Sequence, residues 1–174
     1  MTTIVAVKHH DQIAIAGDGQ VTMGEKYISK GTAHKIRRIY DDNVIIGFAG
    51  GVADAFTLAD WLEKKLKAYS GDLRRSAVEL AQDWRKDSTL QKLEAMLIAF
   101  DKDNLLLISG NGEVIEPDEN VVSIGSGGYF AQAAAIAMTR HADEMSATEI
   151  AHEAVDIAGS IDIFTNHDIM TDQF

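Results

Sequence analysis

The first fifty residues follow hydrophobic patterns that are typical of β-strands. Apolar and polar positions alternate, with many β-branched side chains, which predicts strands at 2–8, 12–18 and 35–40. Residues 43–50 are almost wholly apolar, which predicts a strand that is covered on both faces. The chain is therefore expected to begin in a sheet.

After residue 50 the apolar spacing changes to that of an α-helix. Apolar residues three and four positions apart predict a helix over 55–69 that ends near Gly71. The same spacing predicts a second helix over 73–84, with Asp72 as its N-cap. A pair of helices is thus expected to follow the first strands.

The second half of the chain again places strands before helices. The strands are predicted at 95–100, 104–109, 113–116 and 120–128. A tight hairpin is predicted at Asn111-Gly112, between the second and the third of them. An alanine-rich helix is expected at 129–142, where small side chains allow its neighbours to approach closely.

The last predicted helix has the clearest start signal in the chain. Ser146 and Glu149 have the spacing of a capping box, and Met145 supplies the residue of a hydrophobic staple. Gly159 is predicted at the C′ position, just past the end of this helix. A final strand is predicted over 161–166.

Helix pairs that follow groups of strands, rather than single strands, favour an α+β fold over a parallel α/β fold. Two sheets between two helical layers would cover every predicted apolar face, which predicts a layered sandwich. Residues 1–174 contain no low-complexity linker, composition break or internal repeat, so a single domain is expected.

Composition narrows the classes of function. With 46% hydrophobic residues the chain can bury a sizeable core, and a net charge of −11 weighs against a nucleic-acid partner. The absence of cysteine excludes disulfides, thiolate metal sites and a cysteine nucleophile. No apolar run approaches the length of a membrane span and no signal-peptide pattern is found, so a cytoplasmic protein without membrane contact is expected.

The glycine-rich and histidine-containing stretches indicate little chemistry on their own. Segment 17–26, GDGQVTMGEK, departs from a phosphate-binding loop because Glu25 stands where lysine is required. Segment 125–130, GSGGYF, offers backbone N–H groups to an anion, but a tight turn is the simpler interpretation. The histidines at 9–10 fall in a predicted loop, so we expect them at the surface rather than as metal ligands.

The start of the chain offers a nucleophile. If Met1 is removed, Thr2 carries a free α-amino group beside its hydroxyl, so one residue supplies both nucleophile and base. A model α-amino group has a pKa of about 7.7–8.0, which leaves a useful neutral fraction near pH 7. The two threonines alone still favour the plainer interpretation, a β-forming residue at the start of a strand.

Motifs along essentially the whole chain resemble, in order, the HslV (ClpQ) family of bacterial proteasome-related peptidases. The segments that carry the resemblance are TTIVAV at 2–7, AGDGQVT at 16–22, HKIRRIY at 34–40, GFAGGVADAFTL at 47–58, KLEAMLI at 92–98, SIGSGG at 123–128 and DIAGSIDIFTN at 156–166. Each is weak alone, whereas the ordered set is highly specific. The resemblance implies an N-terminal-nucleophile (Ntn) hydrolase of peptidase family T1, with the four-layer αββα sandwich of that class.

The resemblance also implies roles for individual residues. Thr2 would be the nucleophile, Lys35 would favour its alkoxide and a neutral amine, and Asp18 would orient Lys35. Ser126 would hydrogen-bond near the amine and help relay its proton. The backbone N–H of Gly47 would form the oxyanion hole, where a small residue lets substrate come close.

A cation is implied in the loop after the last helix, where family members bind one through backbone carbonyls. The matching positions are Gly159, Asp162 and Thr165, and Na⁺ is the expected ion, with Mg²⁺ or Ca²⁺ as alternatives. Asp162 stands where many members carry cysteine, a change that carbonyl ligation tolerates. One additional residue within 25–29 is expected to lengthen a loop without moving the site.

The resemblance further implies an assembly. Two stacked six-subunit rings of this chain would enclose the sites, and the hexameric AAA+ ATPase HslU (ClpY) would unfold substrate proteins and feed them in. The chain has no nucleotide-binding motif, so the partner would hydrolyse ATP. One alternative is a non-catalytic ring subunit that only assembles and docks the ATPase, which a retained Met1 would favour. A second, a small-molecule amidohydrolase of the same fold, is disfavoured by the ordered motifs.

Overall fold

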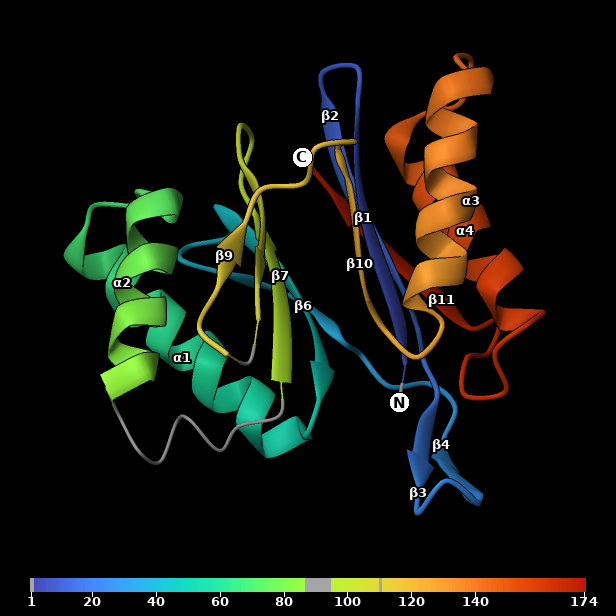
Figure 1. Ribbon diagram of the computed structural model, residues 1–174, viewed down its shortest axis with the longest axis horizontal. Coiled ribbons are helices and arrows are strands. Elements are labelled where there is room, and N and C mark those ends of the chain that lie inside the picture. The colour runs from blue at the N-terminus through green and yellow to red at the C-terminus, as the bar shows by residue number, and fades with distance from the viewer. Residues whose placement is uncertain (1, 87–94, 110) are drawn as a thin grey trace.

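Two antiparallel sheets form the centre of the protein, and the computed structural model describes residues 2–86, 95–109 and 111–174 (Figure 1). The first sheet has the strand order β10 (Val121–Gly125), β1 (Thr3–His9), β2 (Gln12–Asp18) and β11 (Ile169–Gln173). The second has the order β5 (Ile36–Ile39), β6 (Val44–Gly50), β7 (Ala95–Phe100), β8 (Leu105–Ile108) and β9 (Val114–Ile115). The predicted loss of Met1 concerns a residue outside the described ranges.

A pair of helices covers the outer face of each sheet. Helices α1 (Val52–Ala68) and α2 (Leu73–Lys86) lie on the five-stranded sheet, whereas α3 (Gly128–His141) and α4 (Ala147–Gly159) lie on the four-stranded sheet (Figure 1). The layer order is therefore helices, sheet, sheet, helices, which confirms the predicted α+β sandwich. Among the described residues, no helix has both the length and the apolar character needed to cross a membrane.

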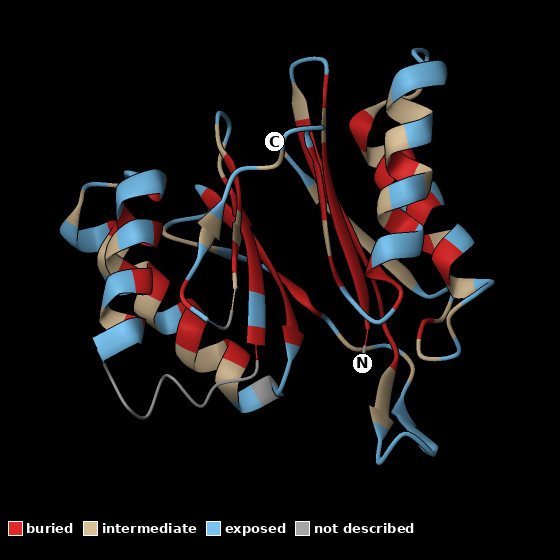
Figure 2. Ribbon diagram, in the orientation of Figure 1, coloured by how far each residue is buried: buried red, intermediate tan, exposed pale blue. Residues whose placement is uncertain are grey.

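Strand β1 packs against other layers on both of its faces. Ile4 and Ala6 pack into the core between the sheets, while Val5 and Val7 pack against α3 and α4. All four side chains are fully buried, so the strand is covered on both faces. The ribbon of β1 is accordingly coloured as buried along most of its length in Figure 2. The residue that precedes β1, Thr2, is therefore attached to a strand that is buried on both faces.

The end of the chain differs from the sequence prediction. The strand predicted over 161–166 is wrong, because this segment forms turns and the last strand is β11. The Asp162 carboxylate accepts hydrogen bonds from the Phe164 N–H at 3.3 Å and the Thr165 hydroxyl at 2.6 Å, which folds the segment back on itself. Gly159 was also misplaced, since it is the last residue of α4 and Ser160 is the C-cap.

Other local predictions have mixed outcomes. The capping box is confirmed, because the Ser146 hydroxyl oxygen accepts from the Glu149 N–H and the Glu149 carboxylate accepts from the Ser146 N–H. Asp72 caps α2 through the Arg75 N–H at 3.0 Å. The hairpin of β3 (Val21–Met23) and β4 (Tyr27–Lys30) had no sequence prediction, and it projects from the body beside the N-terminus (Figure 1).

Candidate active site at the start of β1

Three predicted site residues meet beside the start of β1. They are Thr2, Lys35 and Asp18. Asp18 is the last residue of β2, and Lys35 directly precedes β5, so the two sheets contribute one residue each. The Thr2 hydroxyl donates to Asp18 Oδ1 at 2.6 Å and accepts a short hydrogen bond from Lys35 Nζ. The structure thus brings together the three residues that the resemblance placed at the nucleophile.

Asp18 is held rigidly by backbone donors. Its side chain is buried, and its two oxygens accept from the N–H groups of Thr3 and Gln20, both at 2.9 Å, and of Asn166 at 3.4 Å. These bonds satisfy the oxygens of a buried carboxylate, which would otherwise be costly to desolvate. Asp18 therefore presents a fixed negative charge to Lys35 and Thr2.

Lys35 is buried, with 7% of its surface exposed. Burial lowers the pKa of Lys35 from its usual value, while the charge of Asp18 and the hydrogen bond to it act in the opposite direction. Lys35 Nζ donates to Thr2, to Asp18 at 3.0 Å and to the Gln20 carbonyl at 2.5 Å. These three acceptors match the three donors of an ammonium group, so the site is built around a charged lysine.

Ser126 contacts the backbone of Thr2 rather than its side chain. Its hydroxyl lies 3.3 Å from the Thr2 carbonyl oxygen and 2.7 Å from Asp162 Oδ2. Asp162 Oδ2 also accepts from Thr165, whose hydroxyl lies 2.7 Å from that of Thr3. A chain of hydrogen bonds therefore connects both threonines to the loop after α4, a connection that no sequence signal indicated.

The glycines beside Ser126 are required by close packing against the start of β1. Gly125 has φ +95°, and a Cβ there would lie 2.0 Å from the Thr2 carbonyl oxygen. A Cβ on Gly127 would lie 2.0 Å from Thr3 Oγ1. The GSGG turn thus lets the backbone approach the threonines, which supports the turn interpretation rather than an anion loop.

The register turns the backbone N–H of Gly47, the predicted oxyanion donor, away from the side of β6 where Lys35 lies. Phe48 donates its backbone N–H to the Lys35 carbonyl at 3.2 Å, so this N–H points to the β5 side of β6. Backbone N–H groups alternate in direction along an antiparallel strand. The N–H of Gly47 therefore points to the other side, toward Ile98 of β7. A Cβ on Gly47 would lie 2.6 Å from Ile15 Cδ1, so this glycine serves the packing between the sheets.

The same alternation identifies a residue that the sequence interpretation missed. Gly50 ends β6 and lies two residues beyond Phe48, so its N–H points to the side of the strand where Lys35 lies. Strand β5 begins only at Ile36 and does not extend opposite Gly50. Gly50 also has φ +117°, a conformation that favours glycine.

The three residues predicted to bind a cation lie on one turn. Gly159 ends α4, the Asp162 N–H donates to the Ala158 carbonyl at 2.8 Å, and the Thr165 N–H donates to the Asp162 carbonyl at 3.1 Å. Carbonyls at a helix C-terminus carry partial negative charge, which suits a cation. The Asp162 carboxylate is already occupied by Ser126 and Thr165, so it adds charge to the turn rather than a free ligand.

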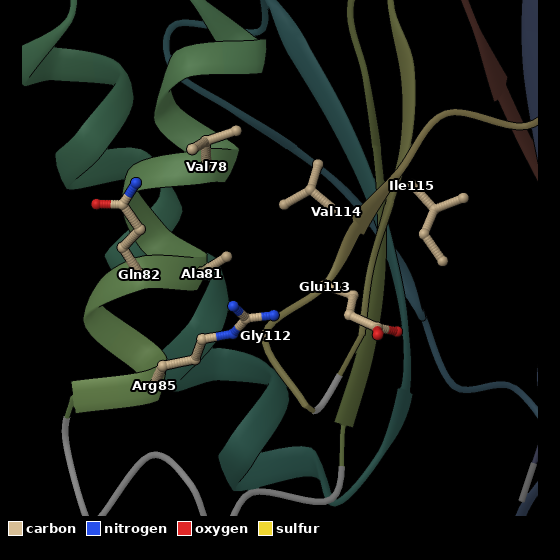
Figure 3. A pocket seen from close by; sticks show the side chains of 8 residues that line it. All are labelled: Val78, Ala81, Gln82, Arg85, Gly112, Glu113, Val114 and Ile115. Atoms are coloured by element: carbon tan, nitrogen blue, oxygen red, sulfur yellow. The ribbon is translucent and has the colours of Figure 1, made fainter.

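A surface pocket of 540 Å³ lies elsewhere, between α2 and β9 (Figure 3). Its lining includes Val78 and Arg85 of α2 and Val114 and Ile115 of β9. None of the residues around Thr2 lines it, so it is not part of the candidate active site.

Comparison with known proteins points to one family. A sequence model described as "Proteasome subunit" matches residues 1–171. The ATP-dependent protease subunit HslV of Lacticaseibacillus casei is 70% identical over 174 residues, which covers all of both chains, and that of Lactobacillus leichmannii is 69% identical over 99% of this chain and 98% of its own. A crystal structure of HslV from Trypanosoma brucei is 45% identical, with a TM-score of 0.93 over 99% of this chain and 98% of that one.

Proposed function

This chain belongs to the proteasome-subunit family as an HslV-type threonine peptidase, and on that premise we propose that Thr2 is its nucleophile. The observation that supports this assignment is the position of the Thr2 hydroxyl between the Asp18 carboxylate and the Lys35 ammonium group. The hydroxyl oxygen attacks the scissile carbonyl, the peptide C–N bond breaks, and an acyl-enzyme ester remains. Water then cleaves the ester and restores the hydroxyl.

Lys35 and Asp18 prepare Thr2 for attack. The Lys35 ammonium group donates to the Thr2 oxygen, so it stabilises negative charge as the hydroxyl loses its proton. The same positive charge favours the neutral form of a nearby α-amine, which accepts that proton once Met1 is gone. Asp18 keeps Lys35 charged and in place, and Ser126 fixes the Thr2 carbonyl on the other side.

The backbone N–H of Gly50 is our proposed donor to the oxyanion, in place of Gly47. It lies on the same edge of β6 as the N–H that binds the Lys35 carbonyl, beyond the start of β5. A backbone donor in this position costs no reorganisation when charge develops on the carbonyl oxygen of the substrate.

The turn after α4 is the proposed cation site, with the carbonyls of Gly159, Asp162 and Thr165 as ligands for Na⁺, or for Mg²⁺ or Ca²⁺. A hard cation there would neutralise the negative end of α4 and stabilise the loop that carries Asp162. Because Asp162 binds Ser126, the ion would support the site without taking part in the reaction.

We place the chain, by analogy with its relatives, in two stacked hexameric rings in the cytoplasm that receive unfolded proteins from the HslU hexamer. The relatives are named subunits of an ATP-dependent protease, and three apolar side chains of the β3–β4 hairpin stand 63–72% exposed on the single chain. These are Met23, Tyr27 and Ile28. Native mass spectrometry should show twelve chains, and a stable monomer would contradict the assembly.

The nucleophile is tested by intact mass and by substitution. The mature chain should lack one methionine, and cleavage of a fluorogenic peptide in the presence of the ATPase should be lost in Thr2→Ala. The matched Thr2→Ser variant keeps a hydroxyl and an amine and should retain cleavage. A retained Met1 in an active chain, or normal cleavage by Thr2→Ala, would show that Thr2 is not the nucleophile, and a retained Met1 without activity would favour a non-catalytic subunit.

A further inference from the structure

Three potential metal ligands meet at the end of the molecule opposite the N-terminus (Figure 1). His9 ends β1, His10 begins the turn to β2, and Asp143 lies in the loop between α3 and α4. The β1–β2 turn and this loop lie at the same end of the fold, opposite the N-terminus (Figure 1). Two segments more than a hundred residues apart in the chain thus contribute to one cluster.

The distances within this cluster suit a metal ion. One ligand atom from each of the three residues lies within 4.8 Å of the others. His10 Nε2 lies 3.3 Å from Asp143 Oδ1 and 3.2 Å from the Asp143 carbonyl oxygen. Two ligands of a tetrahedral ion with bonds of about 2.0–2.1 Å stand about 3.3 Å apart, so this pair already has the separation that zinc requires.

His9 provides a second and independent observation. We expected this histidine at the surface, but only 8% of it is exposed, and its Nε2 is buried with no hydrogen-bond partner in the described structure. A buried polar atom is normally satisfied, so an imidazole left in this state needs an explanation. The centroid of its ring lies 4.1 Å from that of the His10 ring, so the two imidazoles are in contact.

The surroundings favour a divalent cation. The cluster lines a surface pocket of 400 Å³ that also contains Asp11 and Glu144, both exposed carboxylates. The nearby Lys8 side chain donates instead to the Asp103 carbonyl, at 3.0 Å. Two imidazoles with one carboxylate suit Zn²⁺ and related transition metals, whereas Ca²⁺ and Mg²⁺ prefer oxygen ligands alone.

We propose that His9, His10 and Asp143 form a binding site for Zn²⁺ or a similar divalent transition metal, with water completing the coordination. The ion would fasten the turn of the β1–β2 hairpin to the loop between α3 and α4. Its ligands are side chains, in contrast to the carbonyl turn after α4, and neither site depends on the other. The inference stands whether or not the chain cleaves peptides.

Calorimetric titration with Zn²⁺ tests the proposal. Untagged protein, treated with chelator and then kept in excess Na⁺ and Mg²⁺, should bind one Zn²⁺ per chain at this cluster. The variants His10→Asn and Asp143→Asn should bind it at least tenfold more weakly, because each removes one of three protein ligands. Asparagine suits position 10, where φ is +53°, so His10→Asn should fold normally.

His167→Asn provides a matched control. His167 and Asp156 form another exposed histidine–carboxylate pair, at 2.7 Å, and they belong to no group of three ligands among the described residues. This variant should bind Zn²⁺ as the unmodified chain does. Unchanged affinity in both cluster variants, equal weakening in the control, or no Zn²⁺ binding at all would each overturn the proposal.

Two further measurements detect metal binding by independent signals. Co²⁺ in place of Zn²⁺ should give the intense visible absorption of a four-coordinate site in the unmodified chain and lose it in Asp143→Asn. Zn²⁺ at a hundredfold excess over its Kd should raise the Tm by about 5 °C in the unmodified chain and less in the variant. Equal spectra and equal shifts in both proteins would refute the site.

Discussion

Replacing Asp18 with asparagine should be among the most damaging single changes at the site. The carboxylate accepts five hydrogen bonds and carries the charge that faces Lys35. Asparagine has nearly the same shape but has no charge, and one of its two polar atoms becomes a donor. In either orientation of the amide, at least two existing donors would face the NH₂ group.

The size of the effect follows from burial. Asp18 is 1% exposed and Lys35 7%, so removing one charge leaves the other desolvated and without a counter-ion. Breaking a buried pair in this way costs about 3–5 kcal/mol of unfolding free energy. The matched control is Asp172→Asn, which breaks the partly exposed pair with Arg38 and should cost about 1 kcal/mol or less.

The loss should depend on pH in a defined direction. Burial lowers the pKa of Lys35, and Asp18 opposes this effect, so the pKa of Lys35 falls further in Asp18→Asn. The folded variant then releases the lysine proton at lower pH than the folded unmodified chain, while both unfolded chains keep it until about pH 10.4. Because the folded variant binds fewer protons, its stability rises with pH more steeply, and the gap narrows from pH 7 toward pH 10.

Urea unfolding at fixed protein concentration, followed by tryptophan fluorescence, to which the buried Trp84 contributes, measures both effects. The reasoning would be refuted if Asp18→Asn lost no more stability than Asp172→Asn. It would also be refuted if the gap to the unmodified chain stayed constant or widened as the pH rose.

Two further substitutions test local geometry. Gly127→Ala should cost about 1–3 kcal/mol and reduce peptide cleavage, because the new Cβ would lie 2.0 Å from Thr3 Oγ1. In Gly31→Ala the nearest atom is 3.5 Å away, so an equal fall in Tm for both variants would contradict the steric argument. Ser146→Ala should remove the capping box of α4 and cost about 1 kcal/mol in urea unfolding, and an unchanged midpoint would show that the cap contributes nothing.

Most elements could be predicted from local patterns because each has a buried face that sets its hydrophobic period. The predictions differ from the structure where a single hydrogen bond sets the course of the backbone or the direction of an N–H group. Residues 161–166 alternate like a strand, but the Asp162 carboxylate bonds its own loop and turns the chain. Gly47 matched a family role by position, and only the hydrogen bond from Phe48 to Lys35 showed which way its N–H points.

The candidate site shows the same division. The N-terminal threonine, the lysine and the aspartate were identified from ordered motifs, which carry residue identity but no distances. The bond from Ser126 to Asp162 joins residues 36 positions apart, and the cluster of His9 with Asp143 joins two ends of different elements. No local pattern contains such pairs, because they arise only when the strands and loops are packed together.

By itself, the sequence determined most of the strands and helices and the order of the layers, and its ordered motifs identified the nucleophile and its charged neighbours. The elements follow from hydrophobic period, which is local, whereas the roles of the site residues follow from the resemblance of the motifs to a known family. Tertiary structure alone decided which backbone donors face the nucleophile, which carboxylate holds Ser126 and why His9 is buried. Those properties depend on register and close packing between distant segments, and a shift of a single residue would reverse the direction of every N–H along a strand.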